Sequence, residues 1–352
     1  MMTATLHSQT FGPPFDDDAA DIILRSSDQV DFLVYKAILS VASPVFKDMF
    51  SLPQPSGTDA SQQSHTVIDL PESSGALAAL LTVIYPVTPE TIEPRPLNDL
   101  IAALEAARKY DMTTASRHLL QDFENSPFVQ DNPMGAFCAA YAQKLGDAAR
   151  IAARESLKFR MNLDDIGDKL EHTNGPALLR LWRYHRACSA AAVTTNQGAR
   201  LTWITPAQSS WWNVAGPGDR PPNCRCALVS YTLGTQGSHT WQIHVAWANY
   251  IGRARQALRE HPCSKAVTHH DVLLPSYQEA MCQGCQQRIC GLSEFSRYLG
   301  EEVDRRTAQV RKFPRSPLDA SLIVSFFLFS WRFFWTYHFD HPCRSIYLCA
   351  VA

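Results

Sequence analysis

The run from Phe32 to Phe50, FLVYKAILSVASPVFKDMF, constrains the fold more than any other part of the chain. It continues an apolar pattern that begins at Asp21, so DIILR and VDFLVYK predict two strands joined by the turn SSDQ. Ser43 and Pro44 then form a pair that is typical of a helix start. The apolar positions after this pair would share one helical face: Val45, Phe46, Met49 and Phe50. The sequence therefore predicts a hairpin followed directly by short helices.

The rest of the first half predicts one more strand and a series of helices. TVIDLP has the length and composition of a short strand, and SGALAALLTVIYP and PLNDLIAALEAARK have apolar stripes at helical spacing. Further helical patterns follow, up to GPALLRLWRYHRAC. This order indicates an α+β fold in which a small sheet is covered by helices, followed by an α-rich C-terminal region.

Taken together and in this order, these blocks resemble a BTB/POZ domain of the fungal type. FCAAYAQKLGDAARIAARESL is similar to helices that follow BTB domains in many fungal proteins, and the resemblance covers about residues 19–160. Tyr35 stands where the family usually has His. The matching positions are Asp21, Phe32, Lys36, Ile38, Leu39, Ser43, Phe46, Met49, Phe50, Ala107, Lys109, Tyr110 and Met112.

The resemblance implies a protein-docking domain with a shallow groove. Its expected partner-binding residues are Asp21, Tyr35 and Lys36, and we expect a partly buried ion pair between Asp21 and Lys36. The expected partners are other proteins, and the family is compatible with a homodimer. The polar HSQTFGPPFDDDAA replaces the extra helix and strand through which many members exchange strands. SLPQPSG lacks the glutamate of members that recruit cullin ligases, so nothing in the sequence supports that role.

Composition shifts divide the chain into five predicted segments. Residues 1–18 are rich in Pro and Asp and predict a disordered segment, and 19–125 would form the BTB/POZ domain. Residues 126–190 would be a helical extension. The small, polar ACSAAAVTTNQGAR marks a boundary before a Trp- and Cys-containing α-rich module at 200–313. An apolar aromatic tail, 314–352, completes the chain.

The module at 200–313 is predicted to contain two long helices, WQIHVAWANYIGRARQALREH and SEFSRYLGEEVDRRTAQVRKF. It also contains a candidate zinc site. Four thiolates could complete a tetrahedral zinc centre: Cys224, Cys226, Cys282 and Cys285. The alternative interpretation is that these thiols pack as small apolar groups. No other cofactor is expected.

The aromatic tail allows two interpretations. Leu322 to Phe339 is nearly long enough to span a bilayer, so a tail anchor is one, and it is the only membrane contact we expect. Arg332 opposes it, because a charge near the middle of a span costs about 2.5–3.5 kcal/mol. The favoured alternative is that residues 314–352 are an artefact of the gene model.

Charge and targeting signals limit the function. The chain has 32 basic and 34 acidic residues, which gives no long-range attraction to nucleic acid. Its N-terminus does not resemble a secretory signal, so we expect an intracellular protein of the cytoplasm or nucleus. The sequence thus predicts a non-enzymatic adaptor or scaffold. The alternative is a zinc-dependent ligand or nucleic-acid binder that uses the C-terminal Cys and Trp residues.

Overall fold

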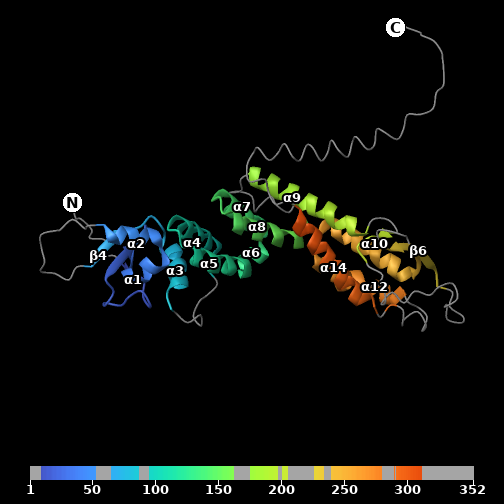
Figure 1. Cartoon of the computed structure of the whole chain (residues 1–352), viewed down its shortest axis with the longest axis horizontal. Helices are drawn as coiled ribbons and strands as arrows, with labels where there is room; N and C mark the ends of the chain where they lie inside the picture. The colour runs from blue at the N-terminus through green and yellow to red at the C-terminus, as the bar shows by residue number, and fades with distance from the viewer. Residues whose placement is uncertain are drawn as a thin grey trace, which may run out of the picture. The chain divides into compact units, whose positions relative to one another are not determined.

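Figure 1 shows the computed structural model of the chain. The structure describes residues 9–52, 65–86, 95–161, 175–196, 200–204, 226–233, 239–279, 289 and 291–310. The described residues all belong to one compact unit. The predicted tail and its candidate anchor at 322–339 therefore lie outside the described residues.

A four-stranded sheet forms the base of the N-terminal region, in the order β1-β3-β2-β4. β2 (Ile22–Arg25) and β3 (Val30–Val34) form the predicted hairpin, in which Leu24 pairs with Phe32. Successive side chains of a strand point to opposite faces of the sheet. Leu24 and Phe32 are both buried, so these paired residues lie on the covered face. β4 (Thr66–Asp69) joins β2 in parallel and confirms the third predicted strand.

Helices cover this sheet, as Figure 1 shows. Ser43 starts α2 as predicted, because its hydroxyl accepts a hydrogen bond from the Phe46 backbone N–H at 3.1 Å. The predicted stripe of the fourth helix is also confirmed, since Leu100, Leu104 and Ala107 are buried. The helices are α1 (Lys36–Ala42), α2 (Pro44–Ser51), α3 (Ser74–Ile84), α4 (Leu97–Lys109) and α5 (Thr113–Asn125).

The prediction that residues 1–18 are disordered is wrong for residues 9–18. β1 (Gln9–Thr10) pairs in parallel with β3, and the Phe15 side chain is only 1% exposed. The ring of Phe15 lies edge-on to Tyr85 at 5.1 Å, and Phe11 stacks on Phe32 at 4.6 Å. Two aromatic rings therefore attach a polar segment to the core, because burial of Phe15 and the stacking of the partly exposed Phe11 offset the cost of ordering it.

Short, alanine-rich helices follow the sheet domain. Small side chains let α7 and α8 approach closely, with Ala136, Ala140, Ala149 and Ala152 buried between their neighbours. α9 contacts α7, and it also contacts α10 and α14 of the C-terminal part. The helices are α6 (Pro127–Asp131), α7 (Pro133–Ala142), α8 (Gly146–Glu155), the 3-10 turn η2 (Ser156–Lys158) and α9 (Gly175–Val193).

The C-terminal part is helical and also contains a three-stranded sheet, in the order β5-β6-β7. The predicted helix at 241–261 begins only at Val245, because the residues up to His244 pair with β6 as strand β7. Phe295 lies at the centre of the apolar cluster, beside Trp247 and Tyr250. The elements are β5 (Arg200–Leu201), β6 (Leu228–Leu233), β7 (His239–His244), α10 (Val245–Glu260), α11 (Ser264–Thr268), α12 (His270–Glu279) and α14 (Leu292–Gln309).

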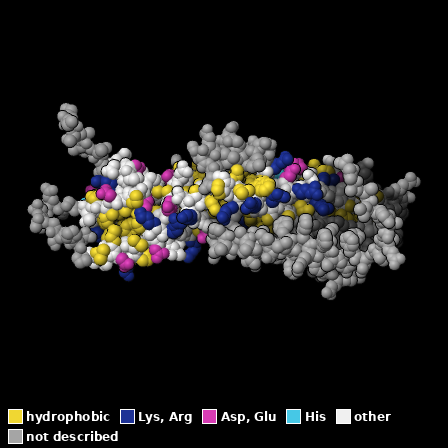
Figure 2. Space-filling model, turned by 90° about the horizontal axis from the view of Figure 1, so that it is seen from above, with side chains coloured by type: hydrophobic (Ala, Val, Ile, Leu, Met, Phe, Trp, Pro, Cys, Tyr) yellow, Lys and Arg dark blue, Asp and Glu magenta, His cyan; other side chains and the backbone are white. Residues whose placement is uncertain are grey.

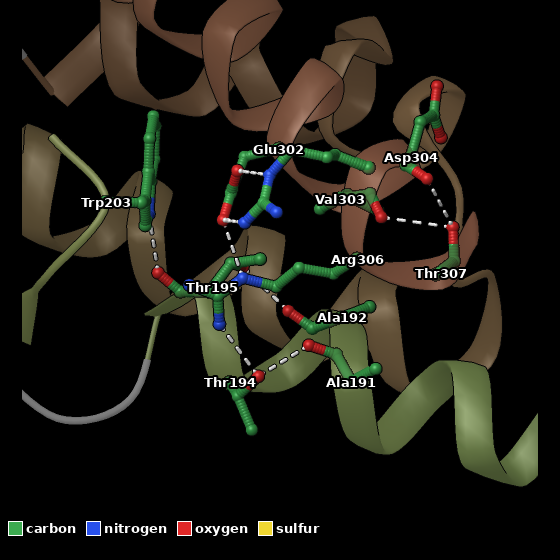
Figure 3. A network of polar contacts seen from close by, with 11 residues as sticks. Ala191, Ala192, Thr194, Thr195, Trp203, Glu302, Val303, Asp304, Arg306 and Thr307 are labelled. Atoms are coloured by element: carbon green, nitrogen blue, oxygen red, sulfur yellow. Dashed lines mark hydrogen bonds and ion pairs between the residues drawn. The ribbon is translucent and has the colours of Figure 1, made fainter. Parts of the chain in front are cut away.

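Figure 3 shows the polar contacts that join the end of α9 to α14. Arg306 donates from Nη1 to Thr194 Oγ1 at 2.9 Å and from Nε to Glu302 Oε1 at 2.6 Å. Trp203 Nε1 donates to the Thr195 carbonyl at 2.8 Å. The bond from Trp203 satisfies a backbone carbonyl just after the C-terminal end of α9.

Candidate functional site

The structure brings the three predicted partner-binding residues together where β3 meets α1. Asp21 directly precedes β2, while Tyr35 and Lys36 follow β3. One carboxylate oxygen of Asp21 accepts a hydrogen bond from the backbone N–H of Lys36 at 2.7 Å. The backbone N–H of Tyr35 donates to the hydroxyl of Tyr85 at 2.8 Å, which joins this junction to the end of α3.

The predicted ion pair between Asp21 and Lys36 is wrong. The Asp21 carboxylate is exposed and binds the first backbone N–H of α1, a position that favours a negative charge. The Lys36 ammonium instead lies 5.9 Å from the centre of the Phe50 ring, within the range of a cation–π contact. Lys36 thus connects the start of α1 to the end of α2 and keeps its charge at the surface.

Tyr35 is held by a second carboxylate. Its hydroxyl donates to Asp17, and this hydrogen bond lowers the pKa of Asp17 and raises the pKa of Tyr35. Asp17 belongs to the segment that was predicted to be disordered. The segment before β2 therefore borders the site, and the sequence pattern gave no sign of this role.

Apolar side chains are exposed beside this junction. Val41 is 91% exposed, Leu52 is 64% exposed and Val45 is 42% exposed. We call these three residues the α1–α2 apolar surface. Figure 2 shows a group of hydrophobic side chains over the N-terminal region, to which α1 and α2 belong. Grouped apolar residues in solvent indicate an interaction site.

Helical periodicity predicts that Val45 shares one face of α2 with Phe46, but Val45 is exposed. Phe46 is the buried residue of that helix, at 2% exposure, and its ring stacks on Tyr110 at 4.7 Å. α2 has only eight residues, so one strongly anchored ring decides its orientation and turns Val45 outward.

A polar cluster joins the end of α4 to the loop between β4 and α3. Lys109 Nζ donates to Glu72 at 2.9 Å, and the Tyr110 hydroxyl donates to the other oxygen of Glu72 at 2.8 Å. Burial raises the pKa of Tyr110 to about 12, so its hydroxyl remains a donor. The Lys-Tyr pair of the family motif therefore has a structural role here, because it ties α4 to the loop between β4 and α3.

Residues 12–126 match the family model of the BTB/POZ domain. The chain contains a BTB/POZ domain. This domain is a protein–protein interaction module that often homodimerises, and it is typically not an enzyme. The match begins within the segment that holds β1, Asp17 and the buried Phe15. No curated protein matches the chain.

The predicted zinc site stays a prediction. Among its four cysteines only Cys226 lies in the described part of the chain, while Cys224, Cys282 and Cys285 lie outside it. Within the described residues, His269, His270 and Asp271 have potential ligand atoms within 4.8 Å of one another. All three are exposed neighbours in sequence, and such groups are common without a metal. Among the described helices, none is both long and apolar enough to cross a membrane.

Proposed function

We propose that this chain is a non-enzymatic adaptor or scaffold whose BTB/POZ domain binds a partner protein through the α1–α2 apolar surface and Lys36. The main support is the exposure of Val41, Leu52 and Val45 on the domain that is known for protein docking. Burial of a side chain such as valine or leucine contributes about 1.5–3 kcal/mol, so a few such residues can dominate an interface.

The charges around this surface indicate how a partner is oriented. Lys36 keeps its ammonium at the surface over Phe50, and Asp17 and Asp21 supply carboxylates on the adjoining β3–α1 junction. A complementary partner would place a carboxylate near Lys36 and a basic group near the two aspartates. Such pairs at an interface rim set orientation and association rate more than affinity.

The proposal is tested by quantitative co-purification of the full chain. Val41→Lys with Leu52→Lys should reduce recovery of each specific partner about tenfold or more, because two apolar contacts are lost. The matched control is Leu274→Lys, a substitution at a 49% exposed leucine of α12. Equal recovery with all variants, together with an unchanged molecular mass of the chain, would contradict the proposal.

Light scattering measures the molecular mass of the purified chain and so tests whether the partner is a second copy of the same chain. If the chain is a dimer that the double substitution dissociates, the α1–α2 apolar surface is a homodimer interface. If the mass is unchanged while partner recovery falls, the surface serves a different protein. Both results support docking through this surface, whereas unchanged mass together with unchanged recovery contradicts it.

A further inference from the structure

A second candidate binding site lies outside the BTB/POZ domain, in a cavity of about 580 Å³. It is formed by α9, the residues that follow η2 and the C-terminal end of α10. This volume falls within the usual range for small-molecule sites. The residues that line it are Arg160, Met161, Trp182, His185, Arg186, Ser189, Ala190, Val193, Thr194, Arg259 and Glu260.

The charges of this cavity favour an anion. Arg160, Arg186 and Arg259 supply three guanidinium groups and Glu260 one carboxylate, which leaves a net charge of +2. Burial lowers the pKa of His185, so its imidazole is neutral near pH 7, and its Nε2 is 3.1 Å from the Phe159 carbonyl. Figure 2 shows Lys and Arg side chains beside hydrophobic ones on the side of the molecule where α9 lies.

These guanidinium groups keep donors available for a ligand. Among the described residues, the carboxylate nearest to Arg160 is Glu260 at 4.0 Å, and Arg160 is 63% exposed. The guanidinium carbon of Arg186 lies 4.8 Å from the centre of the Trp182 ring, a cation–π contact that occupies none of its N–H donors. Arg259 makes a long contact of 3.3 Å to Gln256.

The end of α10 would normally repel an anion, because the last carbonyls of a helix carry partial negative charge. Here the Ser189 hydroxyl lies against two of them, at 3.3 Å from the Leu258 oxygen and 3.1 Å from the Arg259 oxygen. Ser189 therefore reduces the negative potential on that side of the cavity. Most of the remaining wall is apolar, formed by Trp182, Met161, Ala190 and Val193, with Thr194 as a polar member.

We propose that this cavity binds a phosphomonoester with a flat or aromatic organic group, its phosphate among the three arginines and its ring against Trp182. A phosphomonoester carries a charge of about −1.5 to −2 at pH 7. This charge neutralises the net charge of +2 in the cavity more completely than a single carboxylate would. Guanidinium groups match phosphate oxygens with paired hydrogen bonds. The cavity is also larger than an inorganic phosphate ion needs, and this favours an ester.

Calorimetric titration of the full chain at constant ionic strength tests the ligand class. Phenyl phosphate should bind saturably at one site per chain, with inorganic phosphate weaker and benzoate at least about tenfold weaker than phenyl phosphate. Absence of saturable phenyl phosphate binding, or equal binding of benzoate, would overturn the proposal.

Substitutions on one helix test the location. Arg186→Ala should weaken phenyl phosphate binding about tenfold or more, because a charge-assisted contact is lost. The matched control is Arg183→Ala, which removes an exposed arginine of α9 that does not line the cavity. Arg259→Ala, on α10, gives an independent second variant. Equal loss with Arg183→Ala would mean nonspecific attraction and would overturn the proposal.

Two further ligands distinguish the source of the phosphate. Adenosine monophosphate represents a small metabolite and a short phosphotyrosine peptide represents a modified protein. Binding of either that is lost in Arg186→Ala supports the shared chemistry, and the tighter ligand identifies the source. The cavity lies outside residues 12–126, so the double substitution at Val41 and Leu52 should leave phenyl phosphate binding unchanged.

Discussion

At the scale of single residues, Ser43 connects two parts of the BTB/POZ domain. Its buried hydroxyl accepts from the Phe46 backbone N–H at 3.1 Å and donates to the Tyr110 carbonyl at 2.6 Å. Ser43→Ala removes a helix cap and leaves that carbonyl unsatisfied, so the free energy of unfolding should fall by about 2–4 kcal/mol. Urea denaturation measures this change.

Ser73 provides the control for this prediction. It caps α3 by accepting from the Ala76 backbone N–H at 3.3 Å, and it is only half-buried. Ser73→Ala should cost about 1 kcal/mol or less. A loss from Ser43→Ala that is no larger than this would show that the bond to Tyr110 contributes nothing.

Glu302 gives the C-terminal part a dependence on pH. Burial alone would raise the pKa of its carboxyl, but hydrogen bonds from Arg305 and Arg306 outweigh burial and lower the pKa below its ordinary value of 4.5. A lowered pKa means that the stabilisation is fully present above the unfolded-state value and is lost as the pH falls through the folded-state value. The effect therefore belongs to the acidic range below about pH 5.

Glu302→Gln should lower the free energy of unfolding by about 1.5–3 kcal/mol at pH 7. The difference from the natural chain should shrink as the pH falls below 4.5, which denaturant titrations at several pH values can measure. Glu301→Gln is the matched control, because Glu301 is 59% exposed and its pair with Arg297 contributes little. A pH-independent difference would contradict the assigned role of Glu302.

At the scale of elements, the segment around β1 tests whether the N-terminal region belongs to the core. Phe15→Ala should lower the free energy of unfolding by about 3–5 kcal/mol, because Phe15 is 1% exposed and packs against Phe32 and Tyr85. Phe11→Ala serves as the control, since Phe11 is 42% exposed and should cost about 1 kcal/mol. Equal effects of the two variants would mean that the segment is not packed as described.

The same elements show what local patterns can predict. The hairpin β2–β3, strand β4 and the start of α2 at Ser43 were all predictable, because alternation and capping are signals of adjacent residues. Strand β7 was missed although WQIHVAW alternates between apolar and other residues, because the longer helical pattern that follows obscured it. β1 was missed because its anchors, Phe11 and Phe15, are two aromatics in a polar segment.

The candidate site was less predictable than the fold. The family motif located Asp21, Tyr35 and Lys36 at one junction, but no local pattern could show that Asp21 binds a backbone N–H rather than the Lys36 ammonium. The exposure of Val45 depends on the packing of Phe46 against Tyr110, which is distant in sequence. Such contacts join residues that are distant in sequence, so the helical periodicity of one segment cannot predict them.

At the scale of the whole molecule, α9 links the two halves of the described chain. It contacts α7 and also α10 and α14, it lines the arginine-lined cavity, and Thr194, which directly follows it, accepts a hydrogen bond from Arg306 of α14. Composition placed a boundary after residue 190, but Ala192 is buried in the C-terminal apolar cluster. Composition does not show which neighbours a small residue such as Ala192 packs against. The sequence alone therefore could not assign α9 to the N-terminal or the C-terminal part of the chain.

The central claim is that the BTB/POZ domain binds protein through α1 and α2. Hydrogen exchange on the full chain, alone and in complex with a co-purified partner, tests it most directly. We predict that amide protection increases in residues 36–52, with little change in α12, where the exposed Leu274 lies. Unchanged exchange at residues 36–52, with new protection confined to other elements, would contradict the claim.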